Sequence, residues 1–258
     1  MEFNYELSDK TINFIAGAEI EEIGIGCSDS QVFKVKKDNN IYFIKMASLG
    51  LLTNEYNALK WLDKKLLVPK IVMYDIHNNS EFLITEKLDG EMVCSDDMVK
   101  DIDLGIKVIS EAFKNLYSID YSTCPFDVSL DYKLNLVSEN IKRGLIDYDN
   151  LSDDIKARFK SLDEILKYLY DNKFDEELCF SHGDTSLPNI FCKDGKFSGF
   201  IDVGECGIAD KWFDLAICQK SIRRNYGKEA IDKFYKELGI IPDTNKINYY
   251  LLMMELYL

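Results

Sequence analysis

The residues best suited to chemistry are Asp184, Asn189 and Asp202, which lie close together in the last third of the chain. Around them, two apolar runs are separated by Asp194-Gly195, and Asp-Gly in this setting predicts a β-hairpin. A two-residue turn would place Asn189 opposite Phe200, so that Asn189 and Asp202 share one face at the open end of the hairpin. Asp184 arrives at the same end from the preceding loop. Two carboxylates and an amide oxygen gathered there would suit Mg²⁺.

Asp and Asn are also common in ordinary turns, so the hairpin needs support from the rest of the sequence. Lys45 provides it, because it stands in a strongly apolar run at 41–46 that predicts a strand. Glu55 begins a helical pattern soon afterwards and would hold Lys45 charged and aimed at the α- and β-phosphates of a nucleotide. A strand lysine, a helix glutamate, an Asp and Asn in one loop and a later Asp form the ordered set of kinase-type phosphoryl transfer.

With these motifs, the chain resembles the aminoglycoside 3′-phosphotransferases. The likeness rests on a His-Gly-Asp loop at 182–184 that is completed by Asn189 and followed by the strand 198–202. It continues through 209–216 and 221–223, and it is thinner but collinear from 32 to 88. The resemblance implies an α+β, bilobal, protein-kinase-like fold, with an N-terminal nucleotide-binding lobe at 1–88 and a C-terminal catalytic and substrate-binding lobe at 89–258.

The resemblance also implies a reaction, in which the γ-phosphate of ATP or GTP moves to a hydroxyl group of an aminoglycoside and confers antibiotic resistance. Asp184 would accept the proton of that hydroxyl and orient its oxygen, while Asn189 and Asp202 would hold Mg²⁺ as the cofactor. His182 is expected to brace the loop by hydrogen bonds, and Asp214 is expected to be structural.

Three further residues are expected to contact the nucleotide. Ser28 lies in a glycine-containing segment, 24–30, which is neither a P-loop nor a full G-x-G-x-x-G motif. Its place one strand before Lys45 suits the loop that covers the phosphates. By resemblance, the segment 86–90 is the hinge between the lobes, where backbone groups of Glu86 and Leu88 would pair with adenine.

Acidic groups are the candidates for binding a cationic acceptor. By resemblance they come from the insert before the catalytic loop and from the end of the chain, and Glu205 adds a negative charge where the nearest family members carry Arg. The set is Asp153, Asp154, Glu205, Glu255 and the terminal carboxylate of Leu258. Other positions also depart from the family pattern and leave the acceptor open, namely Leu187, Pro188, Ile208 and Met254.

The elements that must position these residues change in type along the chain. Apolar runs predict strands first, at 11–16, 31–35, 41–46, 71–74 and 81–86. Apolar stripes at helical spacing follow, at 104–116, 155–169 and 231–238, the last ended by Gly239, and a final helix begins at Pro242-Asp243. A β-rich part is therefore expected to precede a mainly helical part that carries the catalytic hairpin.

Composition excludes several classes of protein. The 258 residues are 47% hydrophobic and 29% charged, which is typical of a globular protein with a sizeable core. A net charge of −14, most of it beyond residue 90, disfavours nucleic acid as a partner and would attract a polycation. We expect no membrane span and no signal peptide. Seven cysteines without a C-x-x-C pair favour reduced thiols in a cytoplasm.

Other functions stay open at this point. A kinase of the same fold could act on another hydroxylated metabolite of the choline, homoserine or sugar type, or the chain could bind nucleotide without turnover. A hydrolase triad of Ser181, His182 and Asp184 is disfavoured, because triads are assembled from separated segments and no G-x-S-x-G elbow is present. Zinc at Cys179 and His182 is disfavoured too, since no second pair accompanies them.

Overall fold

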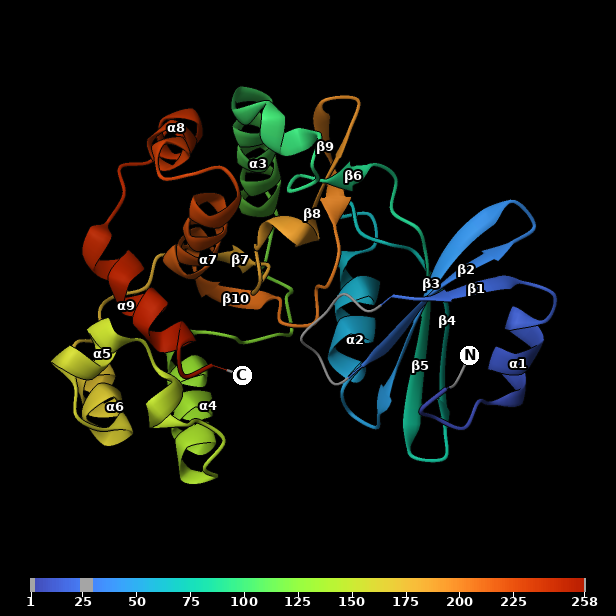
Figure 1. Cartoon of the computed structure of the whole chain (residues 1–258), viewed down its shortest axis with the longest axis horizontal. Helices are drawn as coiled ribbons and strands as arrows, with labels where there is room; N and C mark the ends of the chain where they lie inside the picture. Colours follow the sequence, from blue (N-terminus) through green and yellow to red (C-terminus); the bar gives the residue numbers. More distant parts are fainter. Residues whose placement is uncertain (1–2, 24–29, 258) are drawn as a thin grey trace. The chain divides into compact units, whose positions relative to one another are not determined.

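The computed structural model describes residues 3–23 and 30–257. The chain forms two compact units (Figure 1). Unit 1 comprises Met1–Glu91 and Asn189–Glu205, and unit 2 comprises Met92–Pro188 and Cys206–Leu258. The hairpin predicted from Asp-Gly therefore groups with the N-terminal part of the chain, and the short strand β6 (Glu91–Met92) lies where the chain leaves unit 1.

Unit 1 is built on a five-stranded antiparallel sheet of order β1–β2–β3–β5–β4. Its strands are β1 (Glu19–Glu22), β2 (Gln31–Lys37), β3 (Asn40–Ser48), β4 (Ile71–His77) and β5 (Ser80–Glu86), which confirms the predicted strands from 31 onwards. One face carries the buried cluster Phe33, Val35, Ile44, Met46, Phe82 and Ile84. Side chains alternate along a strand, so Lys45, between Ile44 and Met46, belongs to the other face.

The two faces of this sheet are covered by different helices. Phe14 and Ile15 of α1 (Asp9–Ile15) pack against the buried cluster, while α2 (Thr53–Leu62) packs against β4. The strand expected at 11–16 is wrong, because this segment is α1. Ser8 caps the helix by accepting the N–H of Thr11 at 3.1 Å, and this cap outweighs the β-branched residues that suggested a strand.

The predicted hairpin is confirmed as β8 (Ile190–Lys193) and β9 (Lys196–Phe200), preceded by the 3₁₀ turn Leu187–Asn189. Asp194 and Gly195 form the turn with φ values of 52° and 72°, as a type I′ turn requires. The expected register is wrong by one residue. A bulge leaves Ser198 out of the pairing, so Ile190 lies opposite Phe200 in place of Asn189.

Close backbone contacts attach the hairpin to unit 1. The N–H of Phe200 donates to the carbonyl of Leu67 at 2.9 Å, and the Ser198 hydroxyl donates to the carbonyl of Asp89 at 2.8 Å. Gly90 has a φ of 105°, and a Cβ there would lie 2.2 Å from the carbonyl oxygen of Cys192. Only glycine fits this approach, so the segment after β5 and the hairpin are held together by backbone packing.

Unit 2 is mainly helical. Its helices are α3 (Ile102–Tyr117), α4 (Leu130–Lys142), α5 (Asp153–Arg158), α6 (Leu162–Asp171), α7 (Lys211–Asn225), α8 (Glu229–Leu238) and α9 (Thr244–Met254), with 3₁₀ turns at Met98–Lys100 and Tyr148–Asn150. Helix α3 packs against α8, α7 against α9, and α4 against α6. The strands β7 (Leu178–Ser181) and β10 (Gly207–Asp210) form an antiparallel pair in which Ser181 lies opposite Gly207. The loop after Ser181 is hydrogen-bonded to Asp214 in the first turn of α7.

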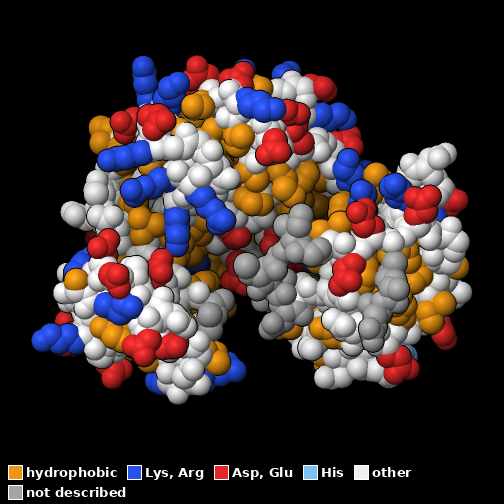
Figure 2. Space-filling view, in the orientation of Figure 1, with side chains coloured by type: hydrophobic (Ala, Val, Ile, Leu, Met, Phe, Trp, Pro, Cys, Tyr) orange, Lys and Arg blue, Asp and Glu red, His pale blue; other side chains and the backbone are white. Residues whose placement is uncertain are grey.

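Most of the helices expected in this unit are confirmed, including the left-handed C-cap at Gly239 and the start of α9 after Asp243. The single helix expected over 155–169 is two, because Phe159 is extended and Ser161 caps a new helix by accepting the N–H of Glu164. Among the described residues, no helix is both long and apolar enough to cross a membrane. Acidic and basic side chains are interspersed over the visible face of each unit (Figure 2).

Candidate active site

In unit 1, the side chain of Lys45 contacts two carboxylates, those of Glu55 and Asp202. The Nζ atom of Lys45 donates to both carboxylate oxygens of Glu55 at 2.8 Å and to Oδ1 of Asp202 at 2.9 Å. The exposed fractions of the side chains rise from 10% at Glu55 through 25% at Lys45 to 56% at Asp202. Glu55 therefore anchors the lysine from the buried side, and Asp202 holds it at the surface, where a ligand can reach both groups.

The environment keeps Lys45 charged. Burial alone would lower the pKa of Lys45, but the negative charges of Glu55 and Asp202 and their hydrogen bonds outweigh burial and raise it. The expected pairing of Lys45 with Glu55 is confirmed. The contact with Asp202 was not predicted, because the two residues are 157 positions apart and no local pattern links them.

The backbone of Asn189 and that of Asp202 lie near each other at the open end of the hairpin. The N–H of Ile201 donates to the carbonyl oxygen of Asn189 at 3.0 Å, so Asn189 is paired with the residue next to Asp202. Asp202 has a φ of 59°, a left-handed conformation that Asp tolerates better than most residues. That both side chains reach one shared ion stays a prediction.

The donor chemistry of these two residues fits Mg²⁺, which prefers carboxylate and amide oxygens. Within 3–23 and 30–257, no group of three or more His, Cys, Asp or Glu side chains could hold a metal. A site built from Asp202 and Asn189 would therefore need phosphate oxygens and water to complete an octahedral shell, which is how Mg²⁺ is usually held next to a nucleotide.

The loop of unit 2 that carries Asp184 is braced by Asp214. The Asp214 carboxylate accepts the N–H of His182 at 2.8 Å and the N–H of Gly183 at 3.1 Å. The hydroxyl of Thr185 donates to the carbonyl oxygen of Asp214 at 2.7 Å. His182 continues the bracing, because its Nδ1 accepts the N–H of Asp184 at 3.2 Å. The structural roles expected for His182 and Asp214 are therefore seen in the hydrogen bonds.

Asp184 itself is half-buried, and its carboxylate accepts the N–H of Ser186 at 3.1 Å. Asp214 is fully buried, and burial raises its pKa, an effect opposed by its interactions with His182 and Gly183. The two carboxylates differ in their environment. One is held at the surface of a fixed loop, and the other fixes that loop from the interior.

The structure describes only some of the other residues that were expected to contact the nucleotide. Ser28 lies outside the described residues. Glu86 is exposed at the end of β5, and its N–H donates to the carbonyl oxygen of Lys70 at 2.9 Å. Leu88 follows in the same segment. The predicted adenine contacts of Glu86 and Leu88 stay a prediction.

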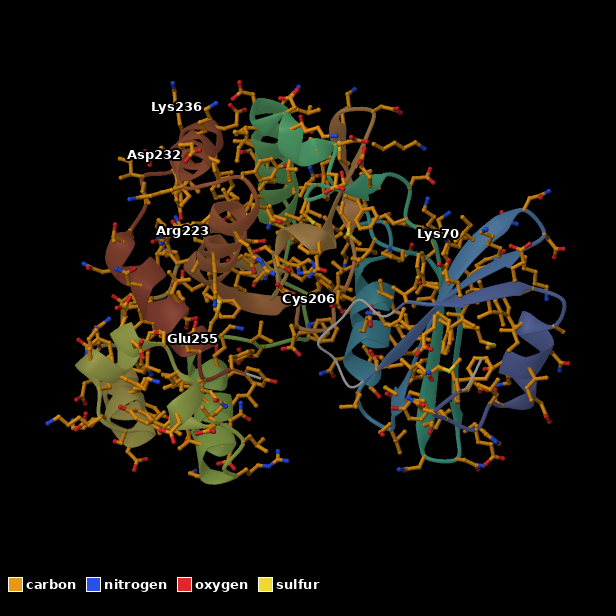
Figure 3. The ribbon with its side chains drawn as sticks, viewed as in Figure 1. Lys70, Cys206, Arg223, Asp232, Lys236 and Glu255 are labelled. Atoms are coloured by element: carbon orange, nitrogen blue, oxygen red, sulfur yellow. The ribbon has the colours of Figure 1, made fainter. Side chains whose placement is uncertain are left out.

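The acidic residues expected to bind the acceptor come from different segments. Asp153 and Asp154 are exposed in the first turn of α5. Glu255 lies at the C-terminal end of α9 (Figure 3), where its carboxylate accepts a hydrogen bond from Nζ of Lys220 at 3.0 Å. Glu205 is exposed at the end of the second segment of unit 1. Leu258 lies outside the described residues, and the acceptor role of the whole set stays a prediction.

Comparison of the sequence with known proteins shows which family the chain resembles. Residues 19–249 match the sequence model of the phosphotransferase enzyme family. The aminoglycoside 3′-phosphotransferases of Enterococcus faecalis and Staphylococcus aureus are each 36% identical over 241 residues, which cover 90% of this chain and 91% of each relative. The corresponding protein of Campylobacter jejuni is 32% identical over 243 residues, covering 90% of this chain and 94% of its own.

Solved structures agree. An aminoglycoside-3′-phosphotransferase of type VIII is similar with a TM-score of 0.80 at 25% identity, covering 93% of this chain and 94% of the other. An aminoglycoside phosphotransferase from Streptomyces rimosus in complex with ADP and streptomycin is similar with a TM-score of 0.77 at 22% identity, covering 98% and 100%. The second likeness supports the fold alone.

Proposed function

The chain belongs to the phosphotransferase enzyme family, and on that premise we propose that it transfers the γ-phosphate of ATP or GTP to a hydroxyl group of an aminoglycoside. The resemblance to aminoglycoside 3′-phosphotransferases and the kinase-like α+β fold expected from the sequence are both confirmed. The observation that carries the proposal is the ion pair of Lys45 with Glu55, which kinase-type phosphoryl transfer uses at its nucleotide site, with Asp202 in contact with the same lysine.

In such a transfer the protein mainly positions the reactants and neutralises charge. Lys45, held by Glu55, would grip the α- and β-phosphates. Asp202 and Asn189 would hold Mg²⁺, which neutralises the phosphate oxygens when it is bound. Asp184 would accept the proton of the acceptor hydroxyl and direct its oxygen toward the γ-phosphorus, from a loop that the Asp214 brace keeps in place.

The acceptor follows from charge and from the relatives. An aminoglycoside carries several ammonium groups, and each charge-assisted hydrogen bond to a partly desolvated carboxylate contributes about 1.5–3 kcal/mol. Asp153, Asp154, Glu205 and Glu255 are the proposed partners, together with the Leu258 carboxylate. Relatives at 36% identity are named aminoglycoside 3′-phosphotransferases, so the 3′-hydroxyl is the acceptor group to test first. The proposal keeps the predicted cytoplasmic location, because the co-substrate is a nucleoside triphosphate.

The test is an ADP-release assay with Mg²⁺, ATP or GTP, and two sets of aminoglycosides that carry or lack a 3′-hydroxyl. Only the first set should be phosphorylated. Asp184→Asn should bind nucleotide normally and lose about 10²–10⁴-fold in kcat, as expected when a positioned base is removed. Asp194→Asn is the matched control, because Asn-Gly supports the same hairpin turn and kcat should not change.

Each other outcome has a definite meaning. Near-normal kcat in Asp184→Asn would remove Asp184 from the mechanism. Phosphorylation of choline, homoserine or a sugar in place of every aminoglycoside would make the chain a kinase of another metabolite and leave the proposed roles of Lys45 and Asp202 intact. Nucleotide binding without transfer to any acceptor would make it a nucleotide-binding protein without this activity.

A further inference from the structure

Glu81 is a buried charged residue that the proposed reaction does not use. It lies in β5 with 0% of its surface exposed, directly before the apolar residues Phe82, Leu83 and Ile84. Burying a carboxylate costs free energy unless hydrogen bonds replace its water. The partners of Glu81 therefore show what its position stabilises.

The Glu81 carboxylate accepts hydrogen bonds from two neighbouring elements, α2 and β4. Its Oε2 accepts the N–H of Leu52 at 2.5 Å and the N–H of Thr53 at 3.1 Å. Its Oε1 accepts the Thr53 hydroxyl and, at 2.5 Å, the Tyr74 hydroxyl. Burial alone would raise the pKa of Glu81, but these hydrogen bonds outweigh it and lower the pKa, so the group is charged at neutral pH.

Two of these donors, the N–H groups of Leu52 and Thr53, lie at the start of α2. The first N–H groups of a helix have no partner within the helix, and a polar residue at the N-cap normally satisfies one of them. Here the N-cap is Leu52, whose apolar side chain cannot accept a hydrogen bond. Glu81 supplies the cap from the neighbouring sheet, and its negative charge also complements the positive end of the helix dipole.

The first turn of α2 links Glu81 to the nucleotide site. Glu55 is the third residue of this helix, two residues after Thr53, and its carboxylate receives both hydrogen bonds from Lys45. On the sheet, Glu81 pairs with Ala47 and Leu83 pairs with Lys45, so Glu81 and Lys45 lie on adjacent strands and on the same face. The first turn of α2 is therefore hydrogen-bonded to Glu81 through Thr53 and to Lys45 through Glu55.

We propose that Glu81 is a positioning residue of the nucleotide site: by capping α2 it fixes the first turn of that helix so that Glu55 meets Lys45. This inference rests on the proposed role of Lys45 and Glu55 in holding the nucleotide phosphates. The stacking of Tyr56 of α2 on Tyr74 of β4, with ring centroids 4.0 Å apart, holds the same turn from a second side.

The experiment measures the affinity of the whole chain for MgATP by calorimetry, together with kcat and KM. Glu81→Gln keeps the size of the side chain and one acceptor oxygen, but turns an NH₂ group toward the N–H donors. It should weaken ATP binding by about ten-fold, or about 1.4 kcal/mol. The KM for the acceptor should stay within about two-fold. Tyr74→Phe removes one donor, keeps the stacking with Tyr56 and should weaken ATP binding by about three-fold.

A double-mutant cycle distinguishes positioning from general destabilisation. If Glu81 acts through Glu55, then Glu81→Gln should weaken ATP binding little further in a chain that already carries Glu55→Gln. The two losses in thermal midpoint should still add. Val35→Ala is the control, because Val35 is buried on the opposite face of the same sheet. It should lower the midpoint and leave ATP affinity unchanged.

The outcomes separate the inference from its premise. Wild-type ATP affinity in both Glu81→Gln and Tyr74→Phe, or full additivity with Glu55→Gln, would show that Glu81 only stabilises the fold. If Glu81→Gln does not fold, Tyr74→Phe and its cycle with Glu55→Gln decide alone. Wild-type ATP affinity in Lys45→Ala would instead overturn the proposed nucleotide site itself.

Discussion

Replacing Asp214 by Asn should show how the catalytic loop depends on one buried carboxylate. Its two oxygens accept the N–H groups of His182 and Gly183. An Asn side chain has one acceptor oxygen, and its NH₂ group would face the other N–H. A buried donor left without an acceptor costs about 1–3 kcal/mol. Since total stability is about 5–15 kcal/mol, Asp214→Asn should fold with a lower thermal midpoint. Asp214→Ala removes this acceptor from both donors, but the Gly183 N–H keeps the Ser181 hydroxyl at 3.2 Å, so the loss should again be about 1–3 kcal/mol.

The larger effect is expected on turnover. The N–H of Asp184 is bonded to Nδ1 of His182 at 3.2 Å, so a shift of His182 and Gly183 moves Asp184 as well. A misplacement of 1 Å can lower a rate by about 10²-fold, so kcat should fall by about ten-fold to a hundred-fold. The KM for ATP should change by less than about two-fold, because Lys45 and Glu55 make their contacts within unit 1.

The assay compares kcat, the KM for ATP and the thermal midpoint with those of Asp210→Asn. Asp210 is also buried at the start of α7, and it accepts the N–H of Glu177 at 3.1 Å and the hydroxyl of Tyr250 at 3.0 Å. The control should lose stability and keep kcat. Wild-type kcat in Asp214→Asn, with a lower midpoint, would refute the reasoning and leave Asp214 with a role in folding alone. An equal loss of kcat in both variants would show a general effect of destabilising α7.

Two further predictions concern the carboxylates of Glu177 and Glu255, which are both partly accessible to solvent. Glu177 contacts Lys211 at 2.5 Å and Lys246 at 3.3 Å and accepts the indole N–H of Trp212 at 2.7 Å, and these contacts lower the pKa of Glu177 to about 2. Since its side chain is about half exposed, Glu177→Gln should lower the free energy of unfolding at pH 7 by only about 1 kcal/mol. Denaturant unfolding should show this difference undiminished above the unfolded pKa and lost as pH falls to about 2. Glu255→Ala should raise the KM of an aminoglycoside by roughly ten-fold or more, with the KM for ATP unchanged and the effect weakened by salt. An unchanged aminoglycoside KM would make Glu255 only a partner of Lys220.

The sequence predicted those elements whose signals are local. The hairpin turn followed from Asp194-Gly195, because few dipeptides adopt the two left-handed conformations that the turn requires. The register did not follow, since the bulge at Ser198 accompanies a close approach of Gly199 to the carbonyl of Leu67, which is far away in the sequence. At 11–16 the β-branched residues favoured a strand, and the short-range cap by Ser8 decided for a helix.

The residues of the site likewise divide into those with a local sequence signal and those without one. Lys45 and Glu55 could be identified because a lysine in an apolar strand and a glutamate at a helix start are visible in the pattern itself. Glu81 could not, because its partners include the backbone N–H groups of Leu52 and Thr53, which any residue type provides. The only unusual feature of Glu81 in the sequence is that a charged residue directly precedes an apolar run in a strand. Such a residue, when it faces a helix that begins with an apolar N-cap, is a candidate for capping from the sheet.

The division of the motif between the units has a consequence for its chemistry. The loop begins in unit 2 at Asp184, and the chain enters unit 1 between Pro188 and Asn189. Asp202 therefore shares a unit with Lys45, to which it is bonded, while Asp184 shares one with its brace, Asp214. The Lys45–Asp202 and His182–Asp214 hydrogen bonds each join residues of one unit. Changes in the first network should therefore alter nucleotide affinity and changes in the second should alter turnover, although the two networks meet in one short motif of the sequence.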